Sequence, residues 1–455
     1  MGQAQIIGLG RSGIAAAKLL QKHGWQVTLG DKATPRQLQS RSNTKELNLA
    51  KQNLEAMGIK VKLGYTLDLT SASLPDLIVV SPGVPWDLPV LVAAREKGID
   101  TIGELELAWR YLDSVPWIGV TGTNGKTTTT ALIAAIFKAA GLNAPACGNI
   151  GYAACELALK ETELDWVIAE MSSYQIEASS ELKPRIGIWT TLTPDHLARH
   201  KTFDNYGAIK ASLLRRSRQQ ILNRDDPYLK KLDPSQWQNA YWTSVSSLDC
   251  QRERQVTIQD AWVVAFGELI LPISLFKLPG IHNQQNLLMA VAAARLAGIE
   301  RSAIAEAITT FPGVPHRLEQ ICNYRGVKYI NDSKATNYDA AQVGLSSVAA
   351  PAILIAGGQA KEGEDRAWIE QIKHSAAAVL LIGEAAELFA RRLHESHYEN
   401  YEIVETLENA VTRAVDLASE KNAKVVLLSP ACASFDRYLS FEARGDRFRE
   451  LCQQL

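Results

Sequence analysis

One stretch constrains the fold of this 455-residue chain more than any other. An apolar run, a glycine-rich loop and a helical run follow one another from residue 117, beginning "WIGVTGTNGKTTTT". In such an arrangement a buried strand ends in a turn whose backbone N–H groups can surround phosphate oxygens, and the following helix adds the partial positive charge of its N-terminus. Strand, loop and helix in this order predict an α/β fold with the loop at the carboxyl edge of a parallel sheet.

The loop resembles the phosphate-binding pattern G-x-x-x-x-G-K-[ST], in which the lysine reaches the β- and γ-phosphates and the hydroxyl binds Mg²⁺. Val120 stands where the pattern has its first glycine, which alters the loop entrance but not the end that touches phosphate. A glycine turn that binds nothing is the alternative, and it leaves the flanking strand and helix unexplained. We predict that the protein binds ATP and Mg²⁺, with the phosphates against Gly122, Thr123, Asn124, Gly125, Lys126, Thr127 and Thr128.

A second acidic element should hold the metal. Glu170 ends the apolar run "DWVIAE", and Asp195 and His196 follow another apolar run in "TLTPDHLARH". Open α/β sheets bind ligands at the carboxyl ends of their strands, where a carboxylate can hold Mg²⁺. An exposed glutamate at a strand end is the alternative for Glu170. The two elements together predict a metal site.

The N-terminus carries a second glycine motif. Gly8, Gly10 and Gly13 follow a first apolar run, and Asp31 ends the next one. This spacing is the dinucleotide fingerprint, so a hydride-transferring dehydrogenase is one interpretation. The same turn can hold the diphosphate of a nucleotide-linked substrate, and close helix–strand packing alone is a third interpretation. No paired catalytic histidine or tyrosine supports hydride transfer, but the three interpretations stay open at this point.

The length suggests about three domains at roughly 150 residues each. Apolar runs alternate with helical runs through all three parts of the chain, while residues 239–278 carry short alternating runs that predict a β-rich addition at the edge of the middle domain. "FPGVPHR" predicts the linker into the last part. We therefore expect an α/β protein with three domains: a Rossmann-like N-terminal domain (1–113), a central P-loop ATPase-like domain (114–313) and a Rossmann-like C-terminal domain (314–455).

Composition excludes several classes of partner. The net charge is −1 and the sequence pI about 6.7, so no general field attracts nucleic acid. No apolar run approaches the ~20 residues of a membrane span, and the N-terminus lacks the pattern of a signal peptide. The six cysteines are scattered, which is typical of a reducing compartment. We expect a cytoplasmic protein, monomeric, with no nucleic-acid partner and no membrane insertion.

Seven stretches occur in the order in which the Mur ligase family of peptidoglycan synthesis carries them. They are "GVTGTNGKTTT", "EMSSYQIE", "TPDHLARH", "GIHNQQN", "PHRLE", "NDSKATN" and "LSPACASFDRY". The chain resembles that family over all three domains, and the family writes its phosphate loop without the first glycine. The resemblance implies an ADP-forming ligase that joins D-glutamate to UDP-N-acetylmuramoyl-L-alanine through an acyl phosphate.

The resemblance also implies roles for residues that match the family's motifs. A carbamylated Lys210 would join Thr127, Glu170 and His196 as metal ligands, whereas the sequence alone makes Lys210 a surface helix lysine. The implied catalytic residues are Lys126, His196, Lys210 and Lys334. The implied contacts to the nucleotide of ATP are Asn283, Asn286, Arg317 and Asp332, although helix capping also explains Asn283. The implied contacts to the UDP substrate are Arg11, Ser12, Asp31, Ser81, Gly83 and Asn149. The implied contacts to the amino acid are Thr336, Lys361, Ser434 and Phe441.

Two other functions stay open. A sister ATP-dependent amide ligase, either another member of the family or a folylpolyglutamate synthetase, would share the middle and last domains. A nucleotide-binding switch without synthetic chemistry would explain the phosphate loop but not "NDSKATN" or "LSPACASFD".

Overall fold

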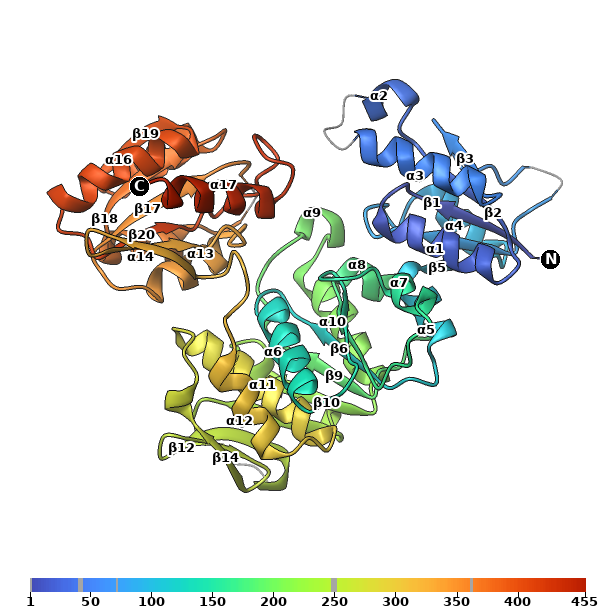
Figure 1. Ribbon diagram of the computed structural model, residues 1–455, viewed down its shortest axis with the longest axis horizontal. Helices are drawn as coiled ribbons and strands as arrows, with labels where there is room; N and C mark the ends of the chain where they lie inside the picture. The colour runs from blue at the N-terminus through green and yellow to red at the C-terminus, as the bar shows by residue number, and fades with distance from the viewer. Residues whose placement is uncertain (1, 40–43, 71–72, 247–251, 361–362) are drawn as a thin grey trace. The chain divides into compact units, whose positions relative to one another are not determined.

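The computed structural model of the chain describes residues 2–39, 44–70, 73–246, 252–360 and 363–455. These residues form three β-sheets with helices packed on them (Figure 1). They divide into two compact units. The first unit contains residues 1–192, 197–275 and 286–309, and the second contains 193–196, 276–285 and 310–455.

The N-terminal sheet has five parallel strands in the order β3–β2–β1–β4–β5. This order places the topological switch between β1 and β4, where open α/β sheets bind ligands. The predicted Rossmann-like domain is therefore confirmed. The strands are β1 (Gln3–Ile7), β2 (Gln26–Asp31), β3 (Lys60–Leu63), β4 (Leu77–Val80) and β5 (Asp100–Gly103), and the helices are α1 (Arg11–Lys22), α2 (Pro35–Gln39), α3 (Thr44–Ala56), α4 (Pro89–Glu96) and α5 (Glu104–Tyr111).

The central sheet has the strand order β14–β13–β12–β11–β10–β9–β6–β8–β7. Its strands are β6 (Trp117–Thr121), β7 (Ala146–Gly148), β8 (Val167–Glu170), β9 (Ile186–Trp189), β10 (Gln219–Asn223), β11 (Ala240–Ser244), β12 (Gln255–Gln259), β13 (Trp262–Ala265) and β14 (Glu268–Pro272). The helices that follow these strands in sequence are α6 (Lys126–Ala139), α7 (Ala154–Leu159), α8 (Ser173–Glu177), α9 (Leu197–His200), α10 (Phe203–Arg216), α11 (Ile281–Leu296) and α12 (Arg301–Thr310).

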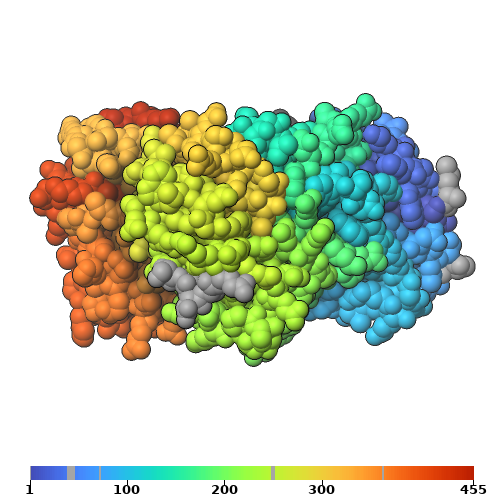
Figure 2. Space-filling model, turned by 90° about the horizontal axis from the view of Figure 1, so that it is seen from below, coloured from blue at the N-terminus to red at the C-terminus, as the bar shows by residue number. Residues whose placement is uncertain are grey.

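The strands from β11 to β14 extend one edge of this sheet, which confirms the predicted β-rich addition. β11 and β12 continue the parallel order, and β13 and β14 turn antiparallel. This segment, in yellow-green, forms part of the surface in Figure 2.

The C-terminal sheet has the order β15–β16–β20–β17–β18–β19, parallel except for the β15–β16 hairpin. Its strands are β15 (Glu319–Tyr324), β16 (Val327–Asn331), β17 (Ala352–Gly357), β18 (Ala376–Ile382), β19 (Tyr401–Glu405) and β20 (Val425–Leu428). Its helices are α13 (Tyr338–Ser346), α14 (Arg366–Ser375), α15 (Ala386–Glu395), α16 (Leu407–Glu420) and α17 (Phe441–Gln453).

Continuous apolar strands explain why all three sheets are covered by helices. Every residue of β4, β6 and β17 is buried, as expected for parallel strands with helices on both faces. Helix α11 is itself apolar on all sides, since each residue from Leu287 to Ala294 is fully buried. The predicted three-domain α/β architecture is confirmed, while the boundaries at 113 and 313 stay predictions. Within the described residues, no helix has the length and apolarity that a membrane crossing needs.

Candidate active site

The phosphate loop between β6 and α6 depends on two glycines. Gly122 has φ +149° and Gly125 has φ +82°, and both conformations favour glycine. A Cβ on Gly122 would lie 1.9 Å from Thr190 Oγ1, and one on Gly125 would lie 2.5 Å from Asn286 Oδ1. The loop is therefore packed between the end of β9 and helix α11, with no room for larger residues.

Lys126, the first residue of α6, turns back over the loop. Its Nζ donates to the carbonyls of Gly122 at 2.9 Å and Thr123 at 2.7 Å. The loop is fixed from the other side, since Thr123 N donates to Thr191 O and Asn124 N donates to Thr191 Oγ1, each at 2.9 Å. An ammonium group at the helix N-terminus can bind phosphate oxygens, so the geometry supports the role predicted for Lys126.

Lys210 on α10 reaches the same loop. Its side chain is 1% exposed, so the surface lysine that the sequence alone suggested is wrong. Lys210 Nζ donates to Gly122 O at 2.8 Å and lies 4.5 Å from the centre of the Tyr206 ring. The Tyr206 hydroxyl is 3.2 Å from Thr123 Oγ1, which ties α10 to the loop a second time. Sequence reasoning missed Tyr206, although its spacing of four from Lys210 puts both on one helix face.

Glu170 is also buried, with 1% exposure, so the exposed strand-end alternative is wrong. Its Oε1 accepts from Asn149 Nδ2 at 2.8 Å, and its backbone carbonyl accepts from Asn149 N at 2.9 Å. Its Oε2 is buried and has no hydrogen-bond partner among the described residues. A buried carboxylate oxygen needs a partner, and a cation supplies one. Glu170 therefore fits a Mg²⁺ ligand.

The predicted metal site does not depend on a preformed cluster of protein ligands. Among the described residues, no group of three or more histidine, cysteine, aspartate or glutamate side chains is arranged to hold a metal ion by itself. Mg²⁺ is commonly held by one or two carboxylates together with phosphate oxygens and water, so few protein ligands suffice. His196 belongs to the second unit, where its Nε2 lies 3.5 Å from Asp195 Oδ2. Its metal and catalytic roles stay predictions.

The glycine motif of the N-terminal sheet opens into a pocket of about 910 Å³. A Cβ on Gly13 would lie 2.0 Å from Gly8 O, so helix α1 starts in direct contact with the end of β1. Asp31 shapes this loop, because its carboxylate accepts from Leu9 N and Ala33 N, each at 2.8 Å. Of the residues predicted to bind substrate, the pocket brings together Arg11, Ser12, Asp31, Ser81, Gly83 and Asn149.

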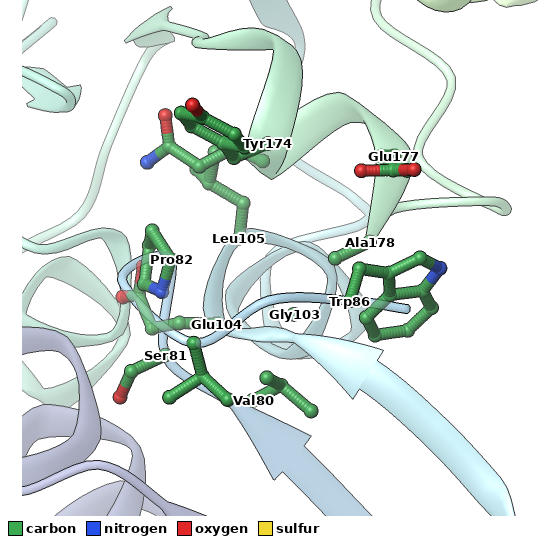
Figure 3. Close-up of a pocket in the computed structure, with 12 residues that line it drawn as sticks. Val80, Ser81, Pro82, Trp86, Gly103, Glu104, Leu105, Tyr174, Glu177 and Ala178 are labelled. Atoms are coloured by element: carbon green, nitrogen blue, oxygen red, sulfur yellow. The ribbon is translucent and has the colours of Figure 1, made fainter. Parts of the chain in front are cut away.

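A small cavity shares part of this lining (Figure 3). Glu104 lines it and is 2% exposed, and burial raises the pKa of its carboxyl to about 7. Glu104 Oε1 accepts from Cys155 N at 2.6 Å, so this side chain caps helix α7 from outside. Glu104 could not be found from local patterns, because its partner lies 51 residues further along the chain.

In the second unit, Asp332 follows the end of β16 and is buried. Its Oδ2 accepts from Ser429 Oγ at 2.8 Å, and Leu318 N approaches Oδ1 at 3.3 Å. Burial raises the pKa of Asp332 to about 7, against the lowering effect of Ser429 and of the Arg317 charge. Two of the residues predicted to contact ATP, Arg317 and Asp332, thus interact electrostatically.

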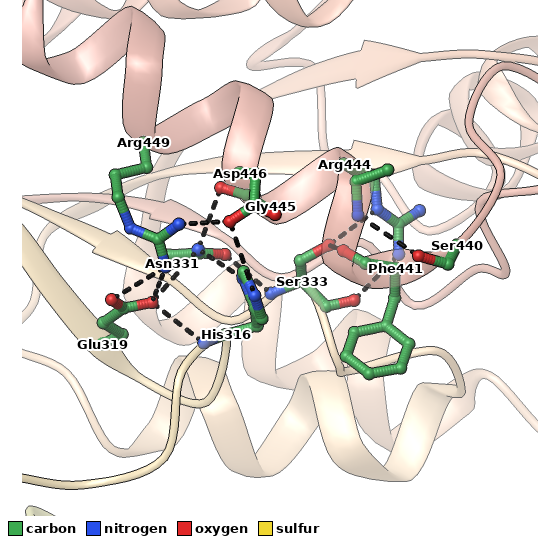
Figure 4. Close-up of polar contacts among 11 residues, drawn as sticks. His316, Glu319, Asn331, Ser333, Ser440, Phe441, Arg444, Gly445, Asp446 and Arg449 are labelled. Carbon is green, nitrogen blue, oxygen red and sulfur yellow. Dashed lines mark hydrogen bonds and ion pairs between the residues drawn. The ribbon is translucent and has the colours of Figure 1, made fainter. Parts of the chain in front are cut away.

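Lys334 and Phe441, two of the residues predicted to act on the amino acid, lie close to each other in this unit. Lys334 Nζ lies 3.7 Å from the centre of the Phe441 ring, and Ser333 Oγ donates to Phe441 O at 2.8 Å. Arg444, 1% exposed, donates to Ser333 Oγ and Ser333 O, each at 2.9 Å (Figure 4). Its Nη2 also donates to Cys432 O at 3.0 Å. Arg444 therefore ties the turn after β16 to the loop after β20. Sequence reasoning missed it.

The remaining predicted residues fall in different places. Thr336 is half-buried two residues after Lys334, and Ser434 is buried. Asn283 Nδ2 donates to Pro279 O at 2.7 Å, while Asn286 Oδ1 lies 3.3 Å from Thr129 Oγ1 beside the phosphate loop. Lys361 lies outside the described residues.

Fold and site together define an α/β protein with a phosphate-loop motif in its central sheet and a separate pocket at its N-terminal sheet. Three family models match the chain: a Mur ligase MurD-like N-terminal domain at residues 2–103, a Mur ligase middle domain at 120–294, and a Mur ligase glutamate ligase domain at 316–432. The chain belongs to the Mur ligase family.

Curated relatives agree over the full length. The chain is 67% identical to the UDP-N-acetylmuramoylalanine–D-glutamate ligase of Microcystis aeruginosa, with 100% of both chains covered. It is 62% identical to the protein of the same name from Synechocystis sp., with 99% of both chains covered. Among solved structures, UDP-N-acetylmuramate-alanine ligase MurC from Thermotoga maritima superposes with a TM-score of 0.59 at 18% identity, covering 100% of both chains. That likeness supports the fold.

Proposed function

We propose that this protein is an ATP-dependent, ADP-forming ligase that adds D-glutamate to UDP-N-acetylmuramoyl-L-alanine during synthesis of peptidoglycan precursors. The proposal rests on the phosphate loop in the form that the family carries, where Lys126 Nζ and Lys210 Nζ both donate to the carbonyl of Gly122. The chain that contains this loop is 67% identical over its full length to a ligase of that name. The alternatives of a dehydrogenase and of a switch without synthetic chemistry do not account for this match.

The chemistry explains the charges at the loop. A carboxylate is a poor electrophile, and ATP converts it into an acyl phosphate that an amine can attack. The obstacle is repulsion, because the carboxylate must approach the polyanionic γ-phosphate. Lys126 and the backbone N–H groups of the loop offset that repulsion and stabilise the transferring phosphoryl group. Mg²⁺, held at Thr127 and Glu170, supplies further positive charge to the phosphate oxygens when bound.

The N-terminal pocket suits the UDP-linked substrate. The backbone N–H groups of the Gly8–Gly13 turn and the N-terminus of α1 favour a diphosphate. Asn149 lines the same pocket and bonds Glu170, so it lies between the substrate pocket and the proposed metal ligand. We assign the UDP moiety to Ser12, Asp31, Ser81 and Gly83, and the muramoyl-alanine part to Asn149.

The amino acid is assigned to the second unit by family resemblance. Thr336, Lys361, Ser434 and Phe441 hold D-glutamate, and Lys334 stabilises the negative charge of the tetrahedral intermediate. Asn283, Asn286, Arg317 and Asp332 contact the nucleotide of ATP. We assign no general base, because a metal-binding role for His196 competes with proton transfer.

The expectations of a monomer in the cytoplasm, with no nucleic-acid partner, accompany this proposal as predictions. The cysteines at 147, 155, 322 and 452 carry thiols, which agrees with a reducing compartment. Size-exclusion chromatography with light scattering would measure the oligomeric state directly.

The test is phosphate release from ATP by the purified protein with UDP-N-acetylmuramoyl-L-alanine. D-glutamate, L-glutamate, L-alanine and meso-diaminopimelate are supplied one at a time, and mass spectrometry identifies the product. Release that requires D-glutamate and the muramoyl substrate together supports the proposal. Release with another amino acid points to a sister ligase, and ATP binding without release under any combination points to the switch.

A further inference from the structure

An arginine at the edge of the substrate pocket holds a turn of the central domain. Arg11 is the first residue of α1 and lines the pocket. Its Nε and Nη2 donate to the two carboxylate oxygens of Glu156, each at 2.8 Å, and its Nη1 donates to Gly151 O at 2.6 Å. Two guanidinium nitrogens therefore bond the start of α7, and the third bonds the loop between β7 and α7. A bidentate pair with a third bond fixes orientation as well as distance.

The turn that Arg11 holds is short and closed. Gly148 N donates to Tyr152 O at 2.9 Å, and Gly148 and Gly151 both have positive φ, at +89° and +67°. Asn149 lies inside this turn and bonds Glu170 through both its side chain and its backbone. A displacement of Gly151 would therefore be passed to Asn149 and then to the carboxylate of Glu170.

A second side chain fixes the other end of the segment. Glu104 Oε1 accepts from Cys155 N at 2.6 Å, and Cys155 Sγ donates to Glu104 O at 3.4 Å. Helix α7 is thus held at its N-terminus by the first residues of α1 and α5. Both helices belong to the N-terminal sheet, and the turn with Asn149 is the part of the central domain that they position.

The Arg11–Glu156 pair does little for stability. The side chains are 59% and 29% exposed, and exposed ion pairs contribute about 0–1 kcal/mol. Its removal should leave the protein folded. The bonds of Arg11 to Glu156 and Gly151 use three of its five N–H donors and direct its guanidinium toward the central domain.

We propose that Arg11 is a positioning residue and does not bind the UDP substrate directly. Together with Glu156 it holds the turn from Gly148 to Tyr152, and this turn places Asn149 against Glu170. This inference rests on the proposed ligase function and refines the substrate-binding role predicted for Arg11. Residues that orient a metal-binding carboxylate affect turnover even though they touch neither metal nor substrate.

The test is a double-mutant cycle of Arg11→Gln, Glu156→Gln and the double variant. The matched control is Glu55→Gln, which removes an exposed ion pair with Lys51 on α3. We expect each variant of the cycle to lower kcat about tenfold with KM for the UDP substrate within about twofold of wild type. The double variant should be no worse than Arg11→Gln alone, because Arg11→Gln already removes both the Glu156 pair and the bond to Gly151. Arg11→Lys, which keeps the charge but not the fork, should recover only part of kcat.

Hydrogen exchange followed by mass spectrometry supplies a readout without substrate. The amides of residues 146–156 should exchange faster in Arg11→Gln and in Glu156→Gln than in wild type and Glu55→Gln. Unchanged exchange would overturn the inference, as would a raised KM in Arg11→Gln alone, which would indicate direct substrate contact. If the wild type shows no D-glutamate-dependent activity, the proposed function fails, and the exchange experiment alone decides whether Arg11 holds the turn.

Discussion

Lys210 Nζ and Lys126 Nζ both donate to the carbonyl oxygen of Gly122, at 2.8 and 2.9 Å. Two ammonium groups that share one acceptor lie within a few ångströms of each other and repel, and the repulsion is stronger because Lys210 is buried. Conversion of one of them into an anion would turn that repulsion into attraction. Of the two lysines, Lys210 is the more deeply buried, with 1% exposure.

We predict that Lys210 reacts with CO₂ to give a carbamate, as the family resemblance implies. Incubation of the purified protein with ¹³C-bicarbonate should give a carbamate resonance in the carbon NMR spectrum of the wild type. Lys210→Met, which keeps the length and the apolar stem of the side chain, should lack that resonance. Its absence from the wild type, or its persistence in Lys210→Met, would contradict the prediction.

Lys126→Ala should abolish most of the synthetic activity. It removes the ammonium group that stabilises the transferring phosphoryl group, and loss of one such donor lowers kcat about 10²–10³-fold. Phosphate release from ATP measures the effect. Lys138→Ala is the matched control, because Lys138 is an exposed lysine in the last turn of the same helix. If Lys126→Ala releases phosphate from ATP as fast as Lys138→Ala does, Lys126 does not act on the phosphates.

Glu170→Gln should weaken metal binding without unfolding the protein. The amide keeps the shape of the side chain and an acceptor for Asn149, but it removes the negative charge from a buried position. We expect Mn²⁺, measured by electron paramagnetic resonance as a probe for Mg²⁺, to bind at least about tenfold more weakly. Glu163→Gln, an exposed glutamate just before β8, serves as the control. Unchanged Mn²⁺ affinity would remove Glu170 from the metal site.

Much of the fold could be predicted because its signals are local. The apolar runs that became β4, β6 and β17 are continuous, and glycine motifs directly follow β1 and β6 in two of the three sheets. The phosphate loop could be predicted for the same reason, since its strand, glycines and lysine are adjacent in sequence.

The missed residues depend on long-range contacts. Glu104 caps a helix that starts 50 residues later, and Arg444 bonds Ser333 from 111 positions away. Lys210 illustrates the same limit, because its helical neighbours suggest a surface position while the fold buries it beneath the phosphate loop. Periodicity reports which face of a helix is apolar, but not which polar side chain finds a partner inside.

Asp332 should make the free energy of unfolding depend on pH. Burial raises the pKa of its carboxyl to about 7, from an ordinary value near 3.8. Between these two values the native state keeps the proton and the unfolded state has lost it. The free energy of unfolding therefore falls as the pH rises, by at most about 1.4 kcal/mol per pH unit for this group, and it levels off above the native pKa.

Asp332→Asn cannot titrate and should lack this contribution. Urea denaturation of both proteins at pH 5 and pH 8 measures it, and we expect the wild type to lose about 1–3 kcal/mol more than the variant over that interval. Glu104 contributes in the same direction in both proteins, since burial raises its pKa to about 7 as well, so the difference between the two isolates Asp332. Asp416→Asn, at an exposed carboxylate on α16, should retain the wild-type pH dependence. If wild type and Asp332→Asn lose the same amount, then Asp332 is ionised in the native state, and the Arg317 charge outweighs the effect of burial.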